Sequence, residues 1–356
     1  MAETGSGLFN DNYGGLSSGT VVRRCVFIGN TKRDHRPNYG WGGAIRSKTL
    51  IKVIACKFFG NEATRGGAIY SDDDDGQSVV ASSLFVGNTA HLNDGMYDGW
   101  GGAVYHTGAG LLDFVNCTLN ANHAADRGGG LFVMSGHVNT ANCIYHDNSD
   151  SAGGPAGEID VEAPSGTVDV DYCNVEGGWP TGDGNIDVPP GYRDLDGVDD
   201  IVGTEDDDLR LWLGDACNDA GNNEAVEEVD VDLAWAPRRR DDPQADDTGN
   251  GWSPLVDMGA YEIADCQPNG IPDDVDIADG TSPDDDGNGI PDECQTCVGD
   301  VDGDGDTDQA DLGAMLATYG RCDGDPGYNP NADLDGDDCV NQADLGILLG
   351  DWGCTS

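Results

Sequence analysis

Five copies of one short pattern run through the first half of the chain at intervals of 26 to 34 residues. They read CVFIGN at 25–30, CKFFGN at 56–61, SLFVGN at 83–88, CTLNAN at 117–122 and CIYHDN at 143–148. A second pattern follows each of the first four copies: GGAI at 42–45, GGAI at 66–69, GGAV at 101–104 and GGGL at 128–131. Short strands and glycine turns at this period predict a parallel β-solenoid, because no single unit can bury its apolar side alone.

The alternation of side chains along a strand predicts the interior of this solenoid. Cys25 and Phe27 fall on the same face and are therefore expected to point inward. Stacked rungs would align the phenylalanines in one column and the small Cys or Ser side chains in another. The terminal asparagines would form a third column, in which side-chain amides hydrogen-bond from rung to rung.

These repeats resemble those of polymorphic outer-membrane proteins and related right-handed parallel β-helix proteins. Three later segments, 209–221, 238–241 and 256–262, resemble the end of the bacterial choice-of-anchor Q domain. The resemblance implies a mainly β chain whose residues 1–262 form a right-handed parallel β-helix. That family carries no assigned catalytic residue.

Two acidic loops of twelve residues, offset by 33 residues, occur near the C-terminus. Side-chain oxygens occupy loop positions 1, 3, 5, 9 and 12, and position 7 offers a backbone carbonyl, which is a ligand pattern for Ca²⁺. The ligands of the first loop are Asp300, Asp302, Asp304, Asp306, Asp308 and Asp311. Those of the second are Asp333, Asp335, Asp337, Cys339, Asn341 and Asp344. Each loop leads into an apolar stripe: Leu312, Met315, Leu316 and Tyr319, then Leu345, Leu348, Leu349 and Trp352.

This duplicated unit resembles type I dockerin domains, which attach extracellular proteins to cohesin partners. The resemblance implies a small calcium-binding α module of two loop-helix units at 297–356, holding two calcium ions. It also implies partner contacts at loop positions 10 and 11, which are Gln309 and Ala310, then Gln342 and Ala343. Because dockerins often carry hydroxyl residues there, we expect a cohesin-like or cell-surface protein other than the usual cohesin. The combination of modules is similar to secreted proteins of planctomycete-type bacteria.

Residues 263–296 contain a third repeat, with a period of 19 residues. Its oxygen-bearing residues are Asp265, Gln267, Asn269, Asp273 and Asp276 in the first copy, and Asp284, Asp286, Asn288 and Asp292 in the second. The pattern resembles calcium-binding thrombospondin type 3 repeats and implies a spacer stiffened by further calcium ions. A flexible acidic linker is the alternative.

The chain has 12 cysteines. Six are predicted to be buried free thiols at strand positions of the solenoid: Cys25, Cys56, Cys117, Cys143, Cys173 and Cys217. Each linker repeat has one cysteine, so Cys266–Cys294 is the simplest bridge. Cys297, Cys322, Cys339 and Cys354 allow three connectivities, which stay open.

Charge is divided unevenly along the chain. Residues 1–130 contain 11 Lys and Arg against 12 Asp and Glu, and the remaining residues contain 6 against 55. Such acidity disfavours binding to nucleic acid or to anionic membranes. No apolar run approaches the roughly 20 residues that span a bilayer, so we expect no membrane insertion. No signal peptide is visible after Met1, and because the repeats begin almost at once we expect a trimmed N-terminus; the modules predict an extracellular or cell-surface location.

Two long turns share an aromatic ending and predict a ligand groove. Tyr39 and Trp41 end one, and Tyr97 and Trp100 end the other, with one short-turned rung between them. Arg33, Arg36, Asp94 and Asp98 are expected to hydrogen-bond sugar hydroxyls or carboxylates. The alternative is that both tryptophans only cover the edge of the solenoid.

We therefore expect a calcium-stabilised surface or assembly-attached protein that binds a polysaccharide or another surface ligand. The alternative is a polysaccharide lyase or glycoside hydrolase carried by a dockerin-like tail, and a third class is a structural filament protein. No nucleophile elbow, zinc-protease motif or phosphate loop occurs, so the catalytic residues of an enzyme would be unknown.

Overall fold

The computed structural model describes residues 7–10, 19–32, 40–74, 76–92, 98–151, 157–226, 229, 231–284, 287, 289–294 and 297–354. The chain divides into two compact units, residues 1–264 and 265–356, which are described separately.

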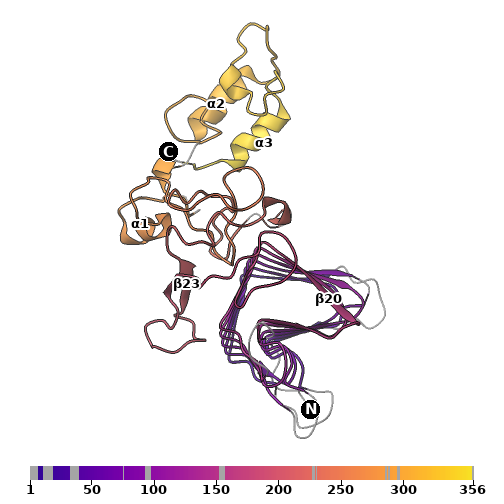
Figure 1. The fold of residues 1–356 in the computed structure, drawn as a ribbon. Helices are drawn as coiled ribbons and strands as arrows, with labels where there is room; N and C mark the ends of the chain where they lie inside the picture. The colour runs from indigo at the N-terminus through magenta and orange to yellow at the C-terminus, as the bar shows by residue number, and fades with distance from the viewer. Residues whose placement is uncertain are drawn as a thin grey trace. The chain divides into compact units, whose positions relative to one another are not determined.

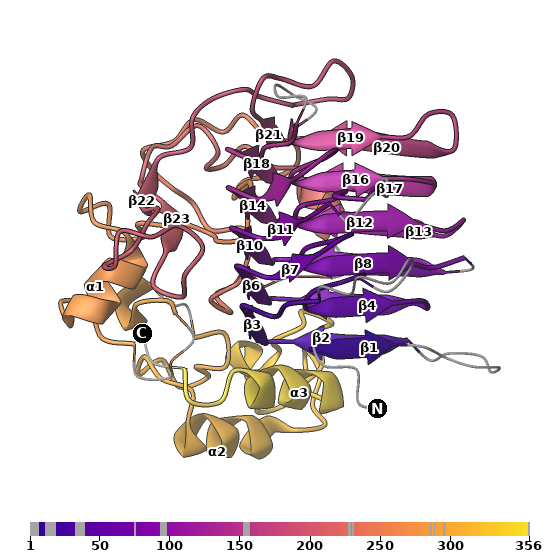
Figure 2. The same ribbon diagram turned by 90° about the horizontal axis from the view of Figure 1, so that it is seen from below.

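The first unit is built on a parallel β-solenoid of about five turns (Figures 1 and 2). Among the described residues it has three six-stranded parallel sheets, in which every strand pairs with the equivalent strand of the next repeat. One sheet contains β1 (Leu8–Asn10), β4 (Ile45–Ser47), β8 (Ile69–Asp72), β12 (Val104–Thr107), β16 (Leu131–Val133) and β19 (Ile159–Val161). A second contains β2 (Thr20–Arg23), β5 (Ile51–Ile54), β9 (Gln77–Ala81), β13 (Leu111–Val115), β17 (Gly136–Ala141) and β20 (Gly166–Asp171).

The third sheet carries the pattern that opens each repeat. It contains β3 (Val26–Ile28), β6 (Lys57–Phe59), β10 (Leu84–Val86), β14 (Thr118–Asn120), β18 (Ile144–His146) and β21 (Asn174–Val175). A short sheet of β7 (Glu62–Ala63), β11 (Thr89–Ala90) and β15 (His123–Ala124) follows it around the turn. The parallel solenoid that the repeats predict is therefore confirmed.

The interior consists of the predicted columns. Phe27, Phe58 and Phe85 stack with ring centroids 5.0 and 4.6 Å apart. The cysteine column precedes the strands of the third sheet, and its thiols donate to backbone carbonyls, as Cys56 Sγ does to Ile54 O at 3.4 Å. Cys25, Cys56, Cys117, Cys143, Cys173 and Cys217 are all free thiols. Two of them depart from the expectation: Cys25, on the first rung, is only partly buried, and Cys217 is buried in a turn after the last rung.

The asparagine column forms the predicted ladder. Asn61 Oδ1 accepts from the backbone N and the Nδ2 of Asn30, at 3.0 and 2.8 Å. The same pair of bonds links Asn61 to Asn88, Asn88 to Asn122 and Asn122 to Asn148. The ladder ends at the buried Glu158, whose two oxygens accept from Asn148 N and Nδ2 at 3.1 and 2.6 Å.

The glycine pairs serve two different needs. Gly66 has φ +61°, in the left-handed region that glycine enters at no steric cost. A Cβ on the following Gly67 would lie 2.1 Å from the carbonyl oxygen of Gly102 on the next rung. One glycine thus makes the turn and the other lets neighbouring rungs approach.

Residues 176–264 continue the first unit as a largely irregular segment along the side of the solenoid. It includes the antiparallel pair β22 (Tyr192–Asp194) and β23 (Asp208–Leu211), and the 3₁₀ helix η2 (Asn223–Val226). Asn116 Nδ2 donates to Asp257 O at 2.8 Å, and Asn142 Nδ2 donates to Asn222 O at 3.0 Å. These bonds fasten the segment to one corner of the rungs.

The second unit contains α1 (Asp273–Asp279), α2 (Gln309–Thr318) and α3 (Gln342–Gly350), with 3₁₀ helices η3 (Asp292–Cys294) and η4 (Pro330–Ala332). Its small apolar core is formed by Val301, Met315, Ala332, Val340 and Leu348. Three disulfides hold it: Cys266–Cys294, Cys297–Cys354 and Cys322–Cys339. The first is the bridge predicted from the repeats, and the other two settle the open connectivity.

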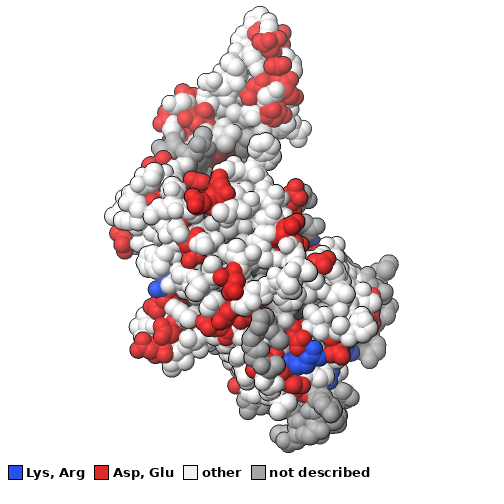
Figure 3. Space-filling model, in the orientation of Figure 1, with Lys and Arg blue, Asp and Glu red and all other residues white. Residues whose placement is uncertain are grey.

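Acidic side chains form several separate patches on the face shown in Figure 3, where Lys and Arg appear in only a few places. None of the helices in the described part of the chain combines the length and apolarity that crossing a bilayer requires.

Candidate functional site

Four side chains lie in one column at the start of the rungs of the first sheet. Trp41 bridges to Arg65, Arg65 to Trp100, and Trp100 to Arg127, each through a parallel β-bridge between neighbouring rungs. All four are half-buried. We call them the aromatic–arginine column.

The column covers an aromatic layer on the outer face of the same sheet. Tyr70, Tyr105 and Phe132 occupy equivalent positions on β8, β12 and β16 and are buried, although they point away from the solenoid interior. Trp41 stacks on Tyr70 with centroids 4.8 Å apart, and Trp100 lies 5.5 Å from Phe132. The solenoid therefore has a second, external apolar cluster, covered by the two indoles.

The guanidinium groups of the column are held by carboxylates. Arg65 lies 5.4 Å from the Trp41 ring and 4.7 Å from the Trp100 ring, and its Nε donates to Asp98 at 2.7 Å. Such cation–π contacts fix a planar side chain between two rings. Arg127 pairs with Asp160 at 2.6 Å and with Glu162, and hydrogen bonds to these carboxylates raise the pKa of Arg127. The column is thus a rigid strip of alternating rings and paired cations.

The structure brings together three of the residues predicted for the groove. Trp41, Trp100 and Asp98 lie at this column, whereas Tyr39, Tyr97, Arg33, Arg36 and Asp94 lie outside the described residues. The space between the two indoles holds the Arg65 guanidinium, which the prediction did not include. The sequence does indicate the position of Arg65, because Arg65 and Arg127 directly precede a glycine pair just as Trp41 and Trp100 do.

The acidic loops of the second unit are shaped around their position 12 carboxylates. Asp311 accepts from the backbone N of Val301 and Asp302 through Oδ1, and from Asp308 N through Oδ2. Asp344 repeats all three bonds with Leu334, Asp335 and Asn341. Burial alone would raise the pKa of Asp311, but these backbone donors lower it overall. The same residues form capping boxes with Asp308 and Asn341 at the starts of α2 and α3.

The carboxylates of the first loop lie close together, with too few hydrogen-bond donors among the described residues to satisfy them. Oxygens of Asp300, Asp302 and Asp311 lie within 4.8 Å of one another, and so do those of Asp304, Asp306 and Asp311. Asp306 Oδ1 is shielded from solvent and has no hydrogen-bond partner among the described residues. Desolvation and then the neighbouring carboxylates raise the pKa of Asp302 and Asp306. An all-oxygen donor set with an orphaned buried oxygen fits a hard cation such as Ca²⁺.

Each loop is closed by the chain that follows the other helix. Thr307, at position 8 of the first loop, exchanges backbone bonds with Gly353 and Cys354, and Val340 in the second does so with Gly320 and Arg321. In the second loop Asp338 adopts φ +66°, where the first loop has a glycine. Cys339 has its sulfur in a disulfide, so only its carbonyl oxygen is available, and that atom accepts from Asn341 Nδ2.

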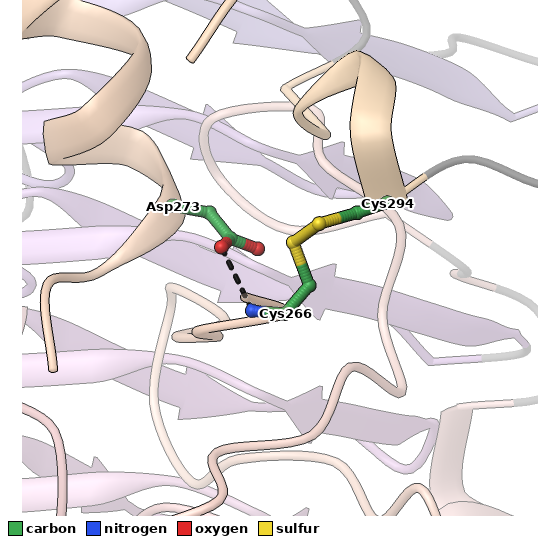
Figure 4. A group of neighbouring side chains, drawn as sticks. All are labelled: Cys266, Asp273 and Cys294. Atoms are coloured by element: carbon green, nitrogen blue, oxygen red, sulfur yellow. Dashed lines mark hydrogen bonds between the residues drawn. A yellow bond between two sulfur atoms is a disulfide. The ribbon is translucent and has the colours of Figure 1, made fainter. Parts of the chain in front are cut away.

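The linker residues form one well-bonded loop. Asp265 accepts from the backbone N of Asn269 and Gly270, and Asn269 Nδ2 donates to Asp276 at 2.7 Å. Gln267 and Asp292 are described, and Asp284 accepts from Gly289 N, whereas Asp286 and Asn288 lie outside the described residues. In Figure 4, Asp273 accepts from Cys266 N at 2.9 Å beside the Cys266–Cys294 bridge. Because these sulfurs are joined to each other, they are not thiolate ligands for a soft metal.

The residues predicted to contact a partner are exposed at the starts of α2 and α3: Gln309, Ala310, Gln342 and Ala343. Part of each predicted apolar stripe is exposed too. Met315 and Leu348 are buried, but Leu316, Tyr319, Leu349 and Trp352 are about half exposed. The unit is too small to cover both sides of two helices, so equivalent apolar patches remain on α2 and α3.

No family model matches the chain, and no solved structure matches it significantly. Over 149 residues the chain is 29% identical to metabotropic glutamate receptor-like protein R of Dictyostelium discoideum. This match covers 42% of the chain and 8% of that protein, so the chain spans only a small part of the relative's length. The chain is similar to that protein over this stretch.

Proposed function

We propose that this protein is an extracellular, calcium-stabilised binding protein that holds a polysaccharide or another surface ligand on the aromatic–arginine column. The observation that carries the proposal is the ordered alternation of Trp41, Arg65, Trp100 and Arg127 along one edge of a rigid sheet. Aromatic side chains offer C–H contacts, and guanidinium–carboxylate pairs offer hydrogen bonds to hydroxyl groups. Because stacking already fixes the rings, little side-chain entropy would be lost on binding.

The finer assignment concerns the type of each module. We take the solenoid to be a right-handed β-helix of the choice-of-anchor Q type, with a thrombospondin type 3-like linker and a dockerin-like C-terminal module. The first-loop carboxylates Asp300, Asp302, Asp304 and Asp311 would hold Ca²⁺, which supplies the positive charge that lets them lie together. The exposed patches on α2 and α3 would attach the protein to a cohesin-like or cell-surface partner. Three disulfides fit an oxidising, extracellular environment.

The test is binding of the full chain to a panel of soluble and insoluble polysaccharides, with calcium present throughout. A double change of Trp41→Ala and Trp100→Ala should weaken binding at least about tenfold, because each ring contributes on the order of 1 kcal/mol. The matched control is Trp252→Ala, which removes an indole that is 92% exposed and outside the column.

Two outcomes would contradict this proposal. If the double variant keeps its melting temperature and binds as tightly as the parent, the column is not the site. If the parent shortens a bound polymer, the protein is a polysaccharide lyase or hydrolase, and the binding assignment is wrong.

A further inference from the structure

A carboxylate is buried in the irregular segment of the first unit. Asp219 has no exposed surface and adopts φ +50°, in the left-handed region. Its backbone N donates to Asp257 Oδ1 at 2.8 Å, and its Oδ2 accepts from Asp242 N at 3.1 Å. Its Oδ1 is shielded from solvent and receives no hydrogen bond from any described residue. A buried carboxylate oxygen without a donor is expensive, so a ligand or a proton is expected there.

Two exposed carboxylates face the same point. An oxygen each of Asp219, Asp241 and Asp247 lies within 4.8 Å of the other two. The chain holds this arrangement in place, because Thr248 N and Gly249 N both donate to Asp219 O, at 3.1 and 3.0 Å. Burial, together with the charges of Asp241, Glu262 and Asp247, raises the pKa of Asp219 to about 7 although Asp242 N donates to it. The three groups therefore repel one another as they stand.

We propose that Asp219, Asp241 and Asp247 bind a calcium ion on the first unit. Ca²⁺ takes six to eight oxygen ligands in flexible geometry, so three carboxylates with water on the exposed side form an acceptable set. The ion satisfies the orphaned Oδ1 of Asp219 and cancels the repulsion among the three charges. No thiolate or imidazole belongs to the set, which disfavours zinc and copper.

The site would act as a clasp. Asp219 lies in the turn that is bonded to Asp257, and Asp241 and Asp247 flank the turn at 242–245. An ion shared among them ties residues 238–250 to the rest of the segment. This site lies in the first unit, so it is independent of calcium binding by the loops at 300–311 and 333–344.

The test is hydrogen–deuterium exchange of the full chain, with Ca²⁺ and with chelator. The amides of Asp242, Thr248 and Gly249 report on the site, because they donate to Asp219. With Ca²⁺ at about ten times its Kd, exchange in peptides covering 238–250 should slow about tenfold, since the bound ion must leave before the clasp opens.

Asp247→Asn is the main variant, because Asp247 is exposed and its loss should not unfold the segment. It should remove most of the calcium effect at 238–250 while leaving any effect at 300–311 intact. Asp246→Asn is the matched control, an exposed neighbour whose carboxylate is outside the cluster, and it should behave as the parent.

Three results would overturn the assignment. One is unchanged exchange at 238–250 when calcium is added to the parent, which would mean that a proton satisfies Asp219. Another is a calcium response of the Asp247→Asn variant as large as that of the parent. If the Asp246→Asn and Asp247→Asn variants lose the calcium effect on exchange equally, calcium only screens acidic charge in general and does not bind at a site.

Discussion

The asparagine ladder allows one substitution to be compared at two positions with different hydrogen-bond surroundings. Asn88 is fully buried in the middle of the ladder. It accepts from Asn61 N and Nδ2, at 3.0 and 2.9 Å, and donates to Phe58 O and to Asn122 Oδ1. Asn88→Ala would leave two buried donors of Asn61 and one acceptor on Phe58 without this partner. At about 1–3 kcal/mol for each of these three unsatisfied groups, the free energy of unfolding should fall by roughly 3–9 kcal/mol.

Asn30 is the matched control at the end of the ladder. Its Nδ2 donates to Asn61 Oδ1, and that oxygen also accepts from Asn30 N, a bond that an alanine retains. Asn30→Ala therefore strands no buried group and should cost about 1 kcal/mol or less.

The measurement is urea unfolding of both variants and the parent in calcium-containing buffer, followed by intrinsic fluorescence. The comparison is valid where the slope of the unfolding free energy against urea concentration is the same in all three proteins, since a changed slope signals a different unfolded or partly folded state. If the two variants differ by less than about 1 kcal/mol, the ladder bonds do not carry the cost that burial implies.

Three further outcomes are expected. Phe58→Ala should lower the free energy of unfolding by about 3–5 kcal/mol, because it opens the stack between Phe27 and Phe85. Val26→Ala, at an outward position that is 49% exposed, should lower it by about 0.5 kcal/mol, and similar urea midpoints for the two variants would contradict the assigned strand register. Desolvation raises the pKa of Glu158 from 4.5 to about 9, so between these pH values the folded state binds a proton that the unfolded state does not, and stability should fall as pH rises. Urea midpoints measured across this pH range should depend less on pH in Glu158→Gln than in the parent, and an unchanged pH profile would refute the role of Glu158. Chelation of calcium should abolish the protection of α2 and α3 from hydrogen exchange, because the loop carboxylates repel one another around a core of few apolar residues, while the sheets of the solenoid keep their protection. Helices that stay protected in chelator would show that calcium does not stabilise the module.

Periodic positions were predictable from the sequence because each one recurs. Phe27, Phe58 and Phe85 identify the inward face three times over, and the asparagines identify the turn in the same way. The aromatic pattern predicts only the two long turns, so it does not include Arg65 and Arg127, which occupy the same column before the other glycine pairs. At the site, the predicted spacing of the indoles gave no indication that a paired guanidinium lies between them.

The segment after the last rung was the least predictable part. Its placement depends on single long-range contacts, such as Asn142 with Asn222, which no repeat announces. The buried pair of Arg238 with Glu262 is a similar case, since neither residue shows in the sequence that it will be buried. In the second unit, the stripes on α2 and α3 gave the right inward residues, Met315 and Leu348, but overestimated how much of each stripe is covered.

The cysteine column, which is buried except at Cys25, separates two kinds of sulfur chemistry within one chain. Burial raises the pKa of the Cys56 thiol to about 11, and it also raises the pKa of the Cys117 and Cys173 thiols. Thiol–disulfide exchange requires an accessible thiolate, so the folded solenoid keeps these sulfurs from attacking the three bridges of the second unit. In the unfolded chain all twelve cysteines become competitors for pairing. Recovery of the native protein after reduction and denaturation therefore depends on the solenoid forming before the oxidant acts.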